Sequence, residues 1–215
     1  FEPWDITEIK GADELYEAEG IIAQSEANAT RLFGTAHTYY STEGSSQCIR
    51  AMLFLALQAA PQTGKRPVLL AARNAHKALL YAALLDFDVE WLWPAPEDSG
   101  ALCSCPVPAA KLADALHALA QQGRKPFGVY VTSPDYLGGV QDIAALAAVC
   151  RAQDVPLLVD NAHGAYLRFL PENRHPIALG AAMCCDSGHK TLPVVTGGAY
   201  LHLGQNAPIQ DEAAV

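Results

Sequence analysis

The sequence predicts an α/β fold, a three-layer α/β/α arrangement around a mainly parallel central sheet. Short, continuous apolar runs alternate with longer helix-like segments along the chain. Strands of a parallel sheet that is covered on both sides have this composition, because both of their faces are buried. Of the 215 residues, 51% are hydrophobic and 17% are charged. The chain can therefore bury a sizeable core and is not an extensively disordered protein.

The first helix is expected over residues 13–33, after an extended lead-in over residues 1–12. Asp13 can cap it, because a side-chain carboxylate accepts hydrogen bonds from the free N–H groups of a first turn. Gly34 is suited to end it, since glycine adopts the left-handed conformation of a helix end at little cost. The inward-facing positions are expected to be Leu15, Ile21, Ile22, Ala29 and Leu32.

From residue 37 onward, apolar runs and helix-like segments alternate regularly. The expected strands span residues 37–41, 68–72, 89–93, 127–131, 156–159, 181–185 and 199–203. The expected helices span residues 47–60, 74–85, 109–122 and 142–152. Residues 94–108 contain four prolines and are expected to form a loop, because the alternation resumes after them. Residues 1–204 are therefore expected to form one major domain, and residues 205–215 a tail or the start of a linker.

Charge and cysteine usage exclude several classes of protein. The net charge is -9 and the pI is near 5.1, and the chain has no basic patch, so we expect no binding to nucleic acid. No apolar run reaches the roughly 18 residues that span a membrane, so no membrane partner is expected. The six cysteines match no zinc-binding spacing, since one residue separates Cys103 from Cys105 and Cys184 adjoins Cys185. We therefore expect free thiols, no metal site and a cytoplasmic protein.

One lysine occupies an unusual place in this pattern. Lys190 lies between the apolar runs 181–185 and 198–203, at the junction of two strands that we expect to be buried. A buried ammonium is costly unless it is paired or neutralised, and forming an imine is one way to neutralise it. Burial would also lower the pKa of this amine and make it nucleophilic. The alternative is an ordinary exposed lysine that follows a strand.

Two further candidates follow the apolar run 157–159. Asp160 ends this run, and a carboxylate there can keep a pyridine nitrogen protonated, which makes the ring an electron sink. Asp160 could instead bind a metal or cap the next loop, although no second carboxylate and no glycine-rich triphosphate loop support a metal. His163 could be a base, a substrate contact or a structural histidine. Lys190 and Asp160 together suggest a site for pyridoxal 5'-phosphate (PLP).

A phosphate-binding turn is expected just before the helix 47–60. Gly44 lets the backbone come close to an anion, and Ser45 and Ser46 add hydroxyls to the free amides of the first turn. Alternatively, a serine merely caps the helix. His76, after the second expected strand, could stack on a flat heteroaromatic ring or be a polar residue at a helix start. A serine hydrolase is not expected, because the chain has no Gly-x-Ser-x-Gly segment.

In these motifs and in their order, the chain resembles the PLP-binding major domain of the ornithine/lysine/arginine decarboxylase family, from about residue 5 to residue 203. The matching stretches are residues 41–46, 73–77, 133–138, 159–164 and 187–190. Together these stretches are specific, although none of them is specific alone. The resemblance implies the aspartate-aminotransferase-like fold (fold type I). It also implies a smaller C-terminal domain, which we expect to be absent from this chain.

The resemblance implies a role for each candidate residue. Lys190 would carry PLP as a Schiff base, Asp160 would pair with the pyridine nitrogen, and His163 would lie near the substrate. His76 would stack on one face of the ring, and Ala162 would pack against the other. The implied catalytic residues are Lys190, His163 and His76. The residues implied to bind the phosphate are Ser45, Ser46, Ser187 and His189, with Gly44 allowing close approach.

The implied reaction is PLP-dependent decarboxylation of a basic amino acid (arginine, lysine or ornithine) to the corresponding amine, in polyamine biosynthesis. A homodimer or higher homo-oligomer is expected by the same resemblance, with contacts from the helix 47–60 and the loop 196–198. The chain departs from the family at Asn161, where many relatives have glutamate, and near Gly197, where many have glutamine. Two alternatives remain open: another fold-type-I PLP enzyme (an aminotransferase or a lyase), and a truncated, non-catalytic PLP-fold fragment.

Overall fold

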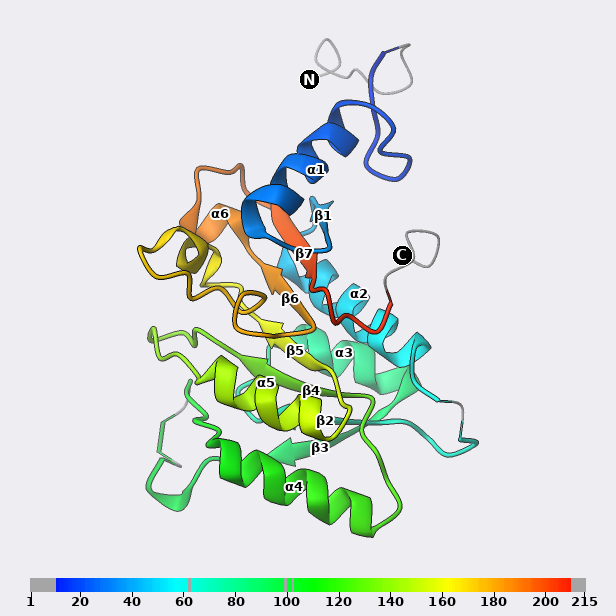
Figure 1. The fold of residues 1–215 in the computed structure, drawn as a ribbon, viewed down its shortest axis with the longest axis vertical. Helices are drawn as coiled ribbons and strands as arrows, with labels where there is room; N and C mark the ends of the chain where they lie inside the picture. The colour runs from blue at the N-terminus through cyan, green and yellow to red at the C-terminus, as the bar shows by residue number, and fades with distance from the viewer. Residues whose placement is uncertain (1–10, 62, 99, 102, 210–215) are drawn as a thin grey trace.

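The computed structural model describes residues 11–209 except residues 62, 99 and 102 (Figure 1). Most of the expected lead-in and the end of the expected tail lie outside these residues. The described part of the chain is built around a single mixed sheet with helices on both of its faces. None of the helices in this part of the chain combines the length and the apolar character that crossing a membrane requires.

The sheet has seven strands in the order β1-β7-β6-β5-β4-β2-β3. The strands are β1 His37–Ser41, β2 Val68–Ala72, β3 Asp88–Leu92, β4 Gly128–Thr132, β5 Leu157–Asp160, β6 Met183–Asp186 and β7 Ala199–Leu203. β7 runs antiparallel to its neighbours β1 and β6, and the other neighbouring pairs are parallel. The predicted mainly parallel sheet is therefore confirmed. The carboxyl ends of β1 to β6 lie at one edge of it, where sites form in such sheets.

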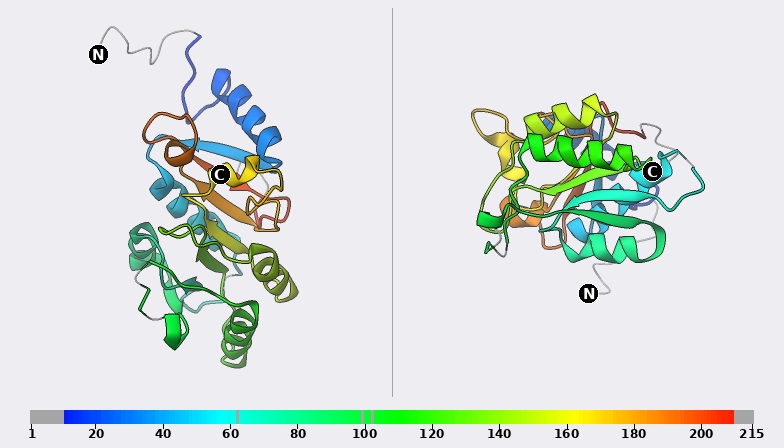
Figure 2. Two further views of the ribbon diagram at one scale, coloured as in Figure 1. Left: turned by 90° about the vertical axis from the view of Figure 1, so that its left-hand side faces the viewer. Right: turned by 90° about the horizontal axis from the view of Figure 1, so that it is seen from below.

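Helices cover both faces of the sheet, as the sequence predicted (Figure 2). The first pair is α2 Ser45–Gln58 and α3 Lys77–Asp86, and the second pair is α4 Ala109–Gln121 and α5 Ile143–Ala152. Each pair closes its own core: Met52 of α2 and Leu158 of β5 belong to one core, and Leu146 of α5 and Val159 of β5 belong to the other. Consecutive residues of β5 thus enter opposite cores, as strand geometry requires.

Three short helical turns lie in the connections. η2 (Pro96–Asp98) falls within the expected loop 94–108, η3 (Ala165–Phe169) follows β5, and α6 (Gly188–Thr191) follows β6 directly. α6 is a single turn at the carboxyl edge of the sheet, and a loop then leads into the antiparallel strand β7. The segment that contains the candidate lysine is therefore a turn on this edge.

Helix α1 (Ile21–Phe33) begins later than residue 13, where the sequence placed its start. Asp13 nevertheless caps the helix from a distance, because its carboxylate accepts hydrogen bonds from the N–H groups of Gly20 and Ile22 at 2.9 and 2.7 Å. These N–H groups have no partner inside the helix. The capping role of Asp13 is therefore confirmed, and the predicted helix start is wrong.

The predicted inward stripe of α1 is also wrong in part. Ile21 and Leu32 are 67% and 50% exposed, whereas α1 turns Glu26, Ala29 and Phe33 toward the protein. The Glu26 carboxylate accepts a hydrogen bond from the Tyr40 N–H of β1 at 2.8 Å. Apolar periodicity could not reveal this face, because a glutamate occupies its centre.

Candidate active site

Polar segments from separate strands meet at the carboxyl edge of the sheet. Ser187 Oγ, after β6, lies 2.8 Å from Ser45 Oγ at the start of α2. Lys190 Nζ, on α6, lies 3.0 Å from His163 Nε2 in the segment after β5. The ring of Tyr136, in the segment after β4, lies 4.8 Å from the His163 ring. The edge therefore brings together residues that are widely separated in the sequence.

Lys190 is exposed, so the expectation that it is buried between two strands is wrong. The reason is that β6 ends at Asp186, and the chain then turns out over the sheet edge through α6. Its partner is the half-buried His163. Burial and the charge of Lys190 lower the pKa of the His163 imidazole, against the opposing effect of Asp160. His163 is therefore neutral at neutral pH, and its Nε2 can accept a hydrogen bond from the Lys190 amine.

Asp160 is buried at the last position of β5, with 2% of its surface exposed. The Tyr130 hydroxyl donates to its Oδ2 at 3.0 Å, and the Ala162 N–H donates to its Oδ1 at 3.2 Å. Burial and the nearby Asp160 raise the pKa of Tyr130 well above its ordinary value, so this hydroxyl keeps its proton and donates. Tyr130 was not predicted as a site residue. Its signal in the sequence is a tyrosine within an otherwise apolar strand.

The start of α2 has the geometry of an anion site. Gly44 precedes it with φ at 71°, and a Cβ built on Gly44 would meet no atom within 4 Å, so the space beside this turn is open. The Gly44 N–H donates to the Gly197 carbonyl at 2.8 Å. The paired hydroxyls of Ser45 and Ser187 lie next to it. Free first-turn amides, hydroxyls and the helix dipole together favour an anion.

Gly197 accounts for one departure from the family. Its φ is +96°, and a Cβ there would lie 2.6 Å from the Thr42 carbonyl oxygen. A residue with a side chain does not fit this loop as it is folded here. The glutamine that many relatives have near this position would therefore require a different loop conformation.

Three other candidates lie at the same edge with roles that remain predictions. His76 caps α3, because its Nδ1 accepts the Ala78 N–H at 3.2 Å. His189 Nδ1 lies 3.1 Å from the Gly198 carbonyl. A carbonyl only accepts hydrogen bonds, so Nδ1 carries the proton, and Nε2 can donate to a phosphate only in the imidazolium form. Ser46 is the second residue of α2 and is half-buried.

A buried polar pair lies directly behind these residues. Asn161 Nδ2 donates to Asp186 Oδ1 at 2.6 Å, and both side chains have 0% of their surface exposed. Asn161 follows Asp160, and Asp186 precedes Ser187, so the pair joins the ends of β5 and β6. It also accounts for the departure at Asn161. A glutamate there would place a second buried carboxylate against Asp186, which is unfavourable.

The seven-stranded, mostly parallel sheet with helices on both faces has the fold of the major domain of fold-type-I PLP-dependent enzymes. The chain belongs to the Orn/Lys/Arg decarboxylase family, whose major-domain model matches residues 3–214. The family resemblance carried by the sequence motifs is thereby confirmed.

Curated relatives agree with this assignment. The chain is 30% identical over 209 residues to the uncharacterized protein YaaO of Bacillus subtilis (strain 168), covering 95% of this chain and 41% of that protein. It is 28% identical over 211 residues to an arginine decarboxylase of the same organism, covering 96% of this chain and 40% of that protein. The chain thus spans about two fifths of the length of these relatives.

Solved structures share the fold. The constitutive lysine decarboxylase of E. coli superposes with a TM-score of 0.69 at 23% identity, covering 94% of this chain and 28% of that chain. Mouse CSAD superposes with a TM-score of 0.71 at 19% identity, covering 92% of this chain and 43% of that chain. At these identities the similarity establishes the fold, and the chemistry has to be argued from the residues of this chain.

Proposed function

We propose that this chain is the PLP-binding part of a decarboxylase that converts a basic amino acid to the corresponding amine. The observation that carries the proposal is the contact of 3.0 Å between Lys190 Nζ and the neutral His163 Nε2. It lies at the sheet edge that also holds Asp160 and the start of α2. Family membership supports decarboxylation. The arginine decarboxylases among the relatives support arginine as the first substrate to test.

Two features of the site fit PLP. The open space beside Gly44 and the adjoining hydroxyls of Ser45 and Ser187 suit a phosphate group. The Asp160 carboxyl group is fixed by donors from Tyr130 and Ala162, and it suits a protonated pyridine nitrogen. The candidate lysine emerges from the same edge on α6.

Each residue would then have a defined task. When bound, PLP supplies an electron sink for the electrons that remain on the substrate α-carbon as carbon dioxide leaves. Lys190 would hold the cofactor, and His163 would take the proton from Nζ and return it. Asp160 would keep a proton on the pyridine nitrogen. His76, Ala162, Ser46 and His189 would complete the cofactor contacts that the family resemblance implies.

We further propose that the amine product serves polyamine biosynthesis in the cytoplasm.

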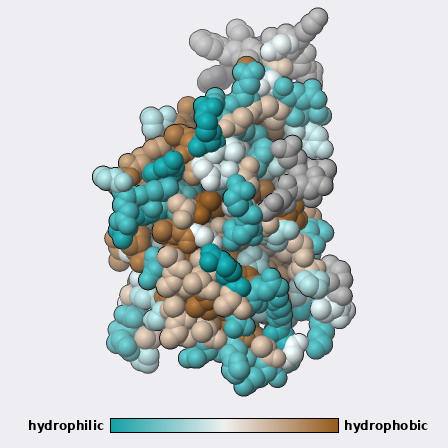
Figure 3. Space-filling view, viewed as in Figure 1, coloured by the Kyte–Doolittle hydropathy of each residue, from teal (hydrophilic) through white to brown (hydrophobic). Residues whose placement is uncertain are grey.

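We also propose that the protein self-associates. Apolar side chains are exposed next to the site, at Tyr166, Phe169 and Val195, which are 41%, 49% and 85% exposed. Figure 3 shows apolar surface on this side of the molecule, at the level of α6 and η3. α2 is less suited to a contact with a second copy than the sequence suggested, because most of its apolar side chains are buried against the sheet.

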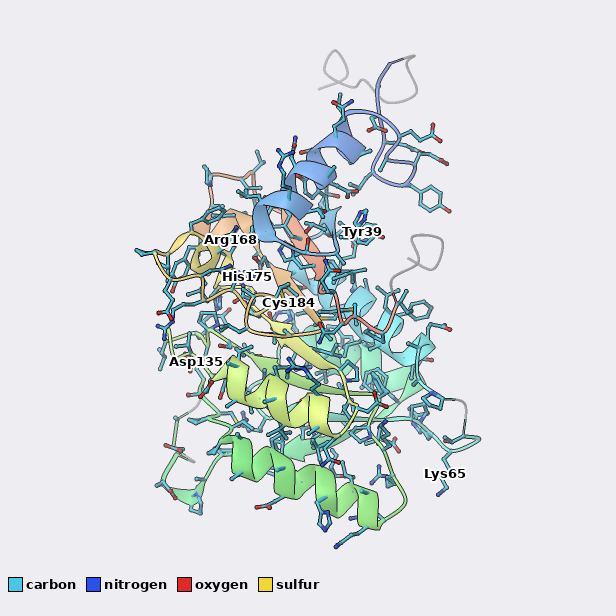
Figure 4. All side chains as sticks on the ribbon, in the orientation of Figure 1. Tyr39, Lys65, Asp135, Arg168, His175 and Cys184 are labelled. Carbon is cyan, nitrogen blue, oxygen red and sulfur yellow. The ribbon has the colours of Figure 1, made fainter. Side chains whose placement is uncertain are left out.

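A PLP-binding experiment tests the central step. The purified chain is incubated with PLP, its visible imine absorbance is recorded, and borohydride reduction followed by peptide mass spectrometry locates the modified lysine. We expect a band that Lys190→Ala abolishes and a label on Lys190. Lys65→Ala is the matched control, because Lys65 precedes β2 at the amino edge of the sheet, far from the site (Figure 4). A label on other lysines with none on Lys190 would overturn the proposal.

Product analysis then tests the reaction. The PLP-loaded protein is incubated with arginine, lysine or ornithine, and released carbon dioxide and amine are measured. We expect both from at least one of these amino acids. If the Lys190 band forms but amino transfer occurs without release of carbon dioxide, PLP binding stands and decarboxylation is excluded.

A further inference from the structure

A short turn after β4 places an aromatic ring against His163 at the carboxyl edge of the sheet. The ring centroids of Tyr136 and His163 lie 4.8 Å apart with an interplanar angle of 76°, which is the edge-to-face geometry that aromatic pairs favour. Tyr136 is 74% exposed. Within the described residues, its hydroxyl forms no hydrogen bond and its ring contacts no aromatic ring other than His163. Neither phosphate binding nor the lysine contact accounts for an exposed tyrosine at this place.

The turn that carries Tyr136 is fixed by the residue before it. Asp135 Oδ1 accepts hydrogen bonds from the N–H groups of Leu137 and Gly139 at 2.9 and 2.8 Å. The Asp135 N–H donates to the Gly139 carbonyl at 2.8 Å. Asp135 therefore closes the turn with both its backbone and its side chain, and Tyr136 has a defined place on it. Figure 4 shows Asp135 on the side of the molecule opposite Lys65, at the carboxyl edge.

The carboxylate of Asp135 keeps its charge although only 5% of the residue is exposed. Burial would raise the pKa of Asp135, but hydrogen bonds from the Ser104 side chain and from the N–H groups of the turn outweigh burial and lower this pKa. An ionised carboxylate forms stronger hydrogen bonds with N–H groups than a neutral acceptor does. At neutral pH the turn is therefore held by charge-assisted hydrogen bonds.

The chain beside Tyr136 also packs directly against the segment that carries His163. A Cβ built on Gly164 would lie 2.6 Å from Pro134 Cδ, so no side chain fits between the two segments. The Pro134 carbonyl accepts a hydrogen bond from the His163 ring. Because Nε2 of this ring faces Lys190 Nζ at 3.0 Å, the donor to the carbonyl is Nδ1. Nε2 then carries the lone pair and can accept a hydrogen bond from the lysine amine.

Access of water to the His163 ring influences its charge. Burial is the largest cause that lowers the pKa of His163, and the Lys190 ammonium on α6 lowers it further. The carboxylates of Asp160, at the end of β5, and Asp135, on the turn, act in the opposite direction, as does the carbonyl that the ring contacts. The Tyr136 ring covers one side of the imidazole. It thus removes water that would stabilise the imidazolium form.

We infer that Tyr136 is a positioning residue of the active site. Its ring shields His163 from water and holds it in the orientation in which Nε2 accepts a hydrogen bond from Lys190. The effect belongs to the apolar body of the ring, because the hydroxyl has no hydrogen-bond partner among the described residues. This role rests on the proposed function of Lys190 and His163, since it acts on the contact between them.

Nitrogen NMR of the cofactor-free wild-type chain tests the orientation of His163. The histidine ring nitrogens are labelled with ¹⁵N, and the His163 signals are identified as those that are missing from His163→Gln. At a pH above the pKa of the ring, we expect the proton on Nδ1 and an unprotonated Nε2, which have clearly different chemical shifts. A proton on Nε2 would direct a donor at the Lys190 amine and would overturn the inference.

Three variants of the turn then test the shielding by NMR titration of His163. Tyr136→Ala should raise the pKa of His163, because water reaches the ring and stabilises the imidazolium form. Tyr136→Phe should keep the wild-type curve, since it retains the body of the ring. Leu137→Ala is the matched control, because Leu137 is the next residue on the same turn and is 80% exposed. A wild-type curve or a lowered pKa in Tyr136→Ala, or an equal rise in Leu137→Ala, would contradict the role of Tyr136.

PLP binding separates this inference from the proposed function. In PLP-treated protein, we expect imine formation at Lys190 to be several-fold slower in Tyr136→Ala than in Tyr136→Phe. If Lys190 takes up no PLP while both NMR results hold, the proposed function fails and Tyr136 still positions His163. If Lys190 takes up PLP and the NMR results fail, the proposed function stands and the inference is overturned. The wild-type NMR measurement decides the orientation of His163 even if a variant fails to fold.

Discussion

At the scale of single residues, the contact between Lys190 and His163 ties the protonation of the His163 ring to the charge of the lysine. The two nitrogens lie 3.0 Å apart, and two positive charges at that distance repel each other. The lowered pKa of His163 is in part the result of this neighbour. A neutral imidazole beside the ammonium avoids that repulsion and can accept its hydrogen bond.

Replacing Lys190 by alanine is therefore expected to raise the pKa of His163, because a charge that disfavours the imidazolium form is removed. NMR titration of the histidine ring signals in the cofactor-free chain measures this shift. Lys125→Ala is the control, since the Lys125 ammonium pairs with Asp154 on the far side of the sheet and should leave His163 unchanged. Superimposable His163 curves for wild type and Lys190→Ala would refute the coupling.

A second prediction concerns the amide at position 161. Asn161→Asp would place a second carboxylate against Asp186, where Asn161 Nδ2 now lies 2.6 Å from Asp186 Oδ1. We expect the free energy of unfolding to fall by about 3–5 kcal/mol, the cost of an uncompensated buried charge. Urea unfolding at neutral pH measures it. Asn28→Asp makes the same change at an exposed position on α1 beside Arg31, and equal losses in both variants would contradict the explanation.

At the scale of elements, the turn before α2 can be tested with a matched pair of glycines. Gly44 and Gly64 have φ values of 71° and 70°, and both have open space where a Cβ would lie. Alanine at either position should therefore cost stability, because φ is positive at both. We expect a loss of about 1–3 kcal/mol, toward the upper end at Gly44, whose ψ of -179° completes a conformation that is essentially confined to glycine. Only Gly44 lies at the candidate phosphate site. We expect Gly44→Ala alone to weaken PLP binding, roughly tenfold, as measured by fluorescence titration. Equal PLP affinity in the two variants would argue against a phosphate at α2.

Most strands and helices were predictable from the sequence, because each buried strand is a continuous apolar run. β1, β2 and β7 have the bounds that the sequence predicted. The failures occur where a polar side chain replaces an apolar signal. α3 begins at Lys77, later than residue 74, because the His76 ring caps it. The buried face of α1 was missed because Glu26 lies in it.

At the scale of the whole molecule, the carboxyl edge of the sheet could be predicted, because a parallel sheet brings separate strand ends together. Ser45 and Ser187, or His163 and Lys190, are far apart in sequence and in contact in the fold. The cluster of His175, Asp186 and His202 could not be predicted in this way. Its members meet because of the cross-strand register of β6 and β7 and the course of a connecting loop, and residue spacing carries no information about either.

The molecule also exposes an apolar surface beside Lys190, at the carboxyl edge of the sheet. Whether this surface contacts another protein can be tested. Val195 lies in the loop between α6 and β7 and is 85% exposed, and Phe169 at the end of η3 is 49% exposed. Apolar surface of this kind next to a site commonly marks a contact with another protein. A second copy of the chain is the partner that the family resemblance implies.

Val195→Asp is therefore expected to shift the protein toward monomer, because a carboxylate would have to be desolvated in the contact. Sedimentation velocity over a range of concentrations measures the change against wild type, for which we expect a dimer or larger assembly. Leu84→Asp is the control. Leu84 is 74% exposed on α3, away from Lys190, so the same charge there should leave the assembly intact. If Leu84→Asp dissociates the protein and Val195→Asp does not, self-association uses α3, and the apolar surface beside Lys190 has another partner.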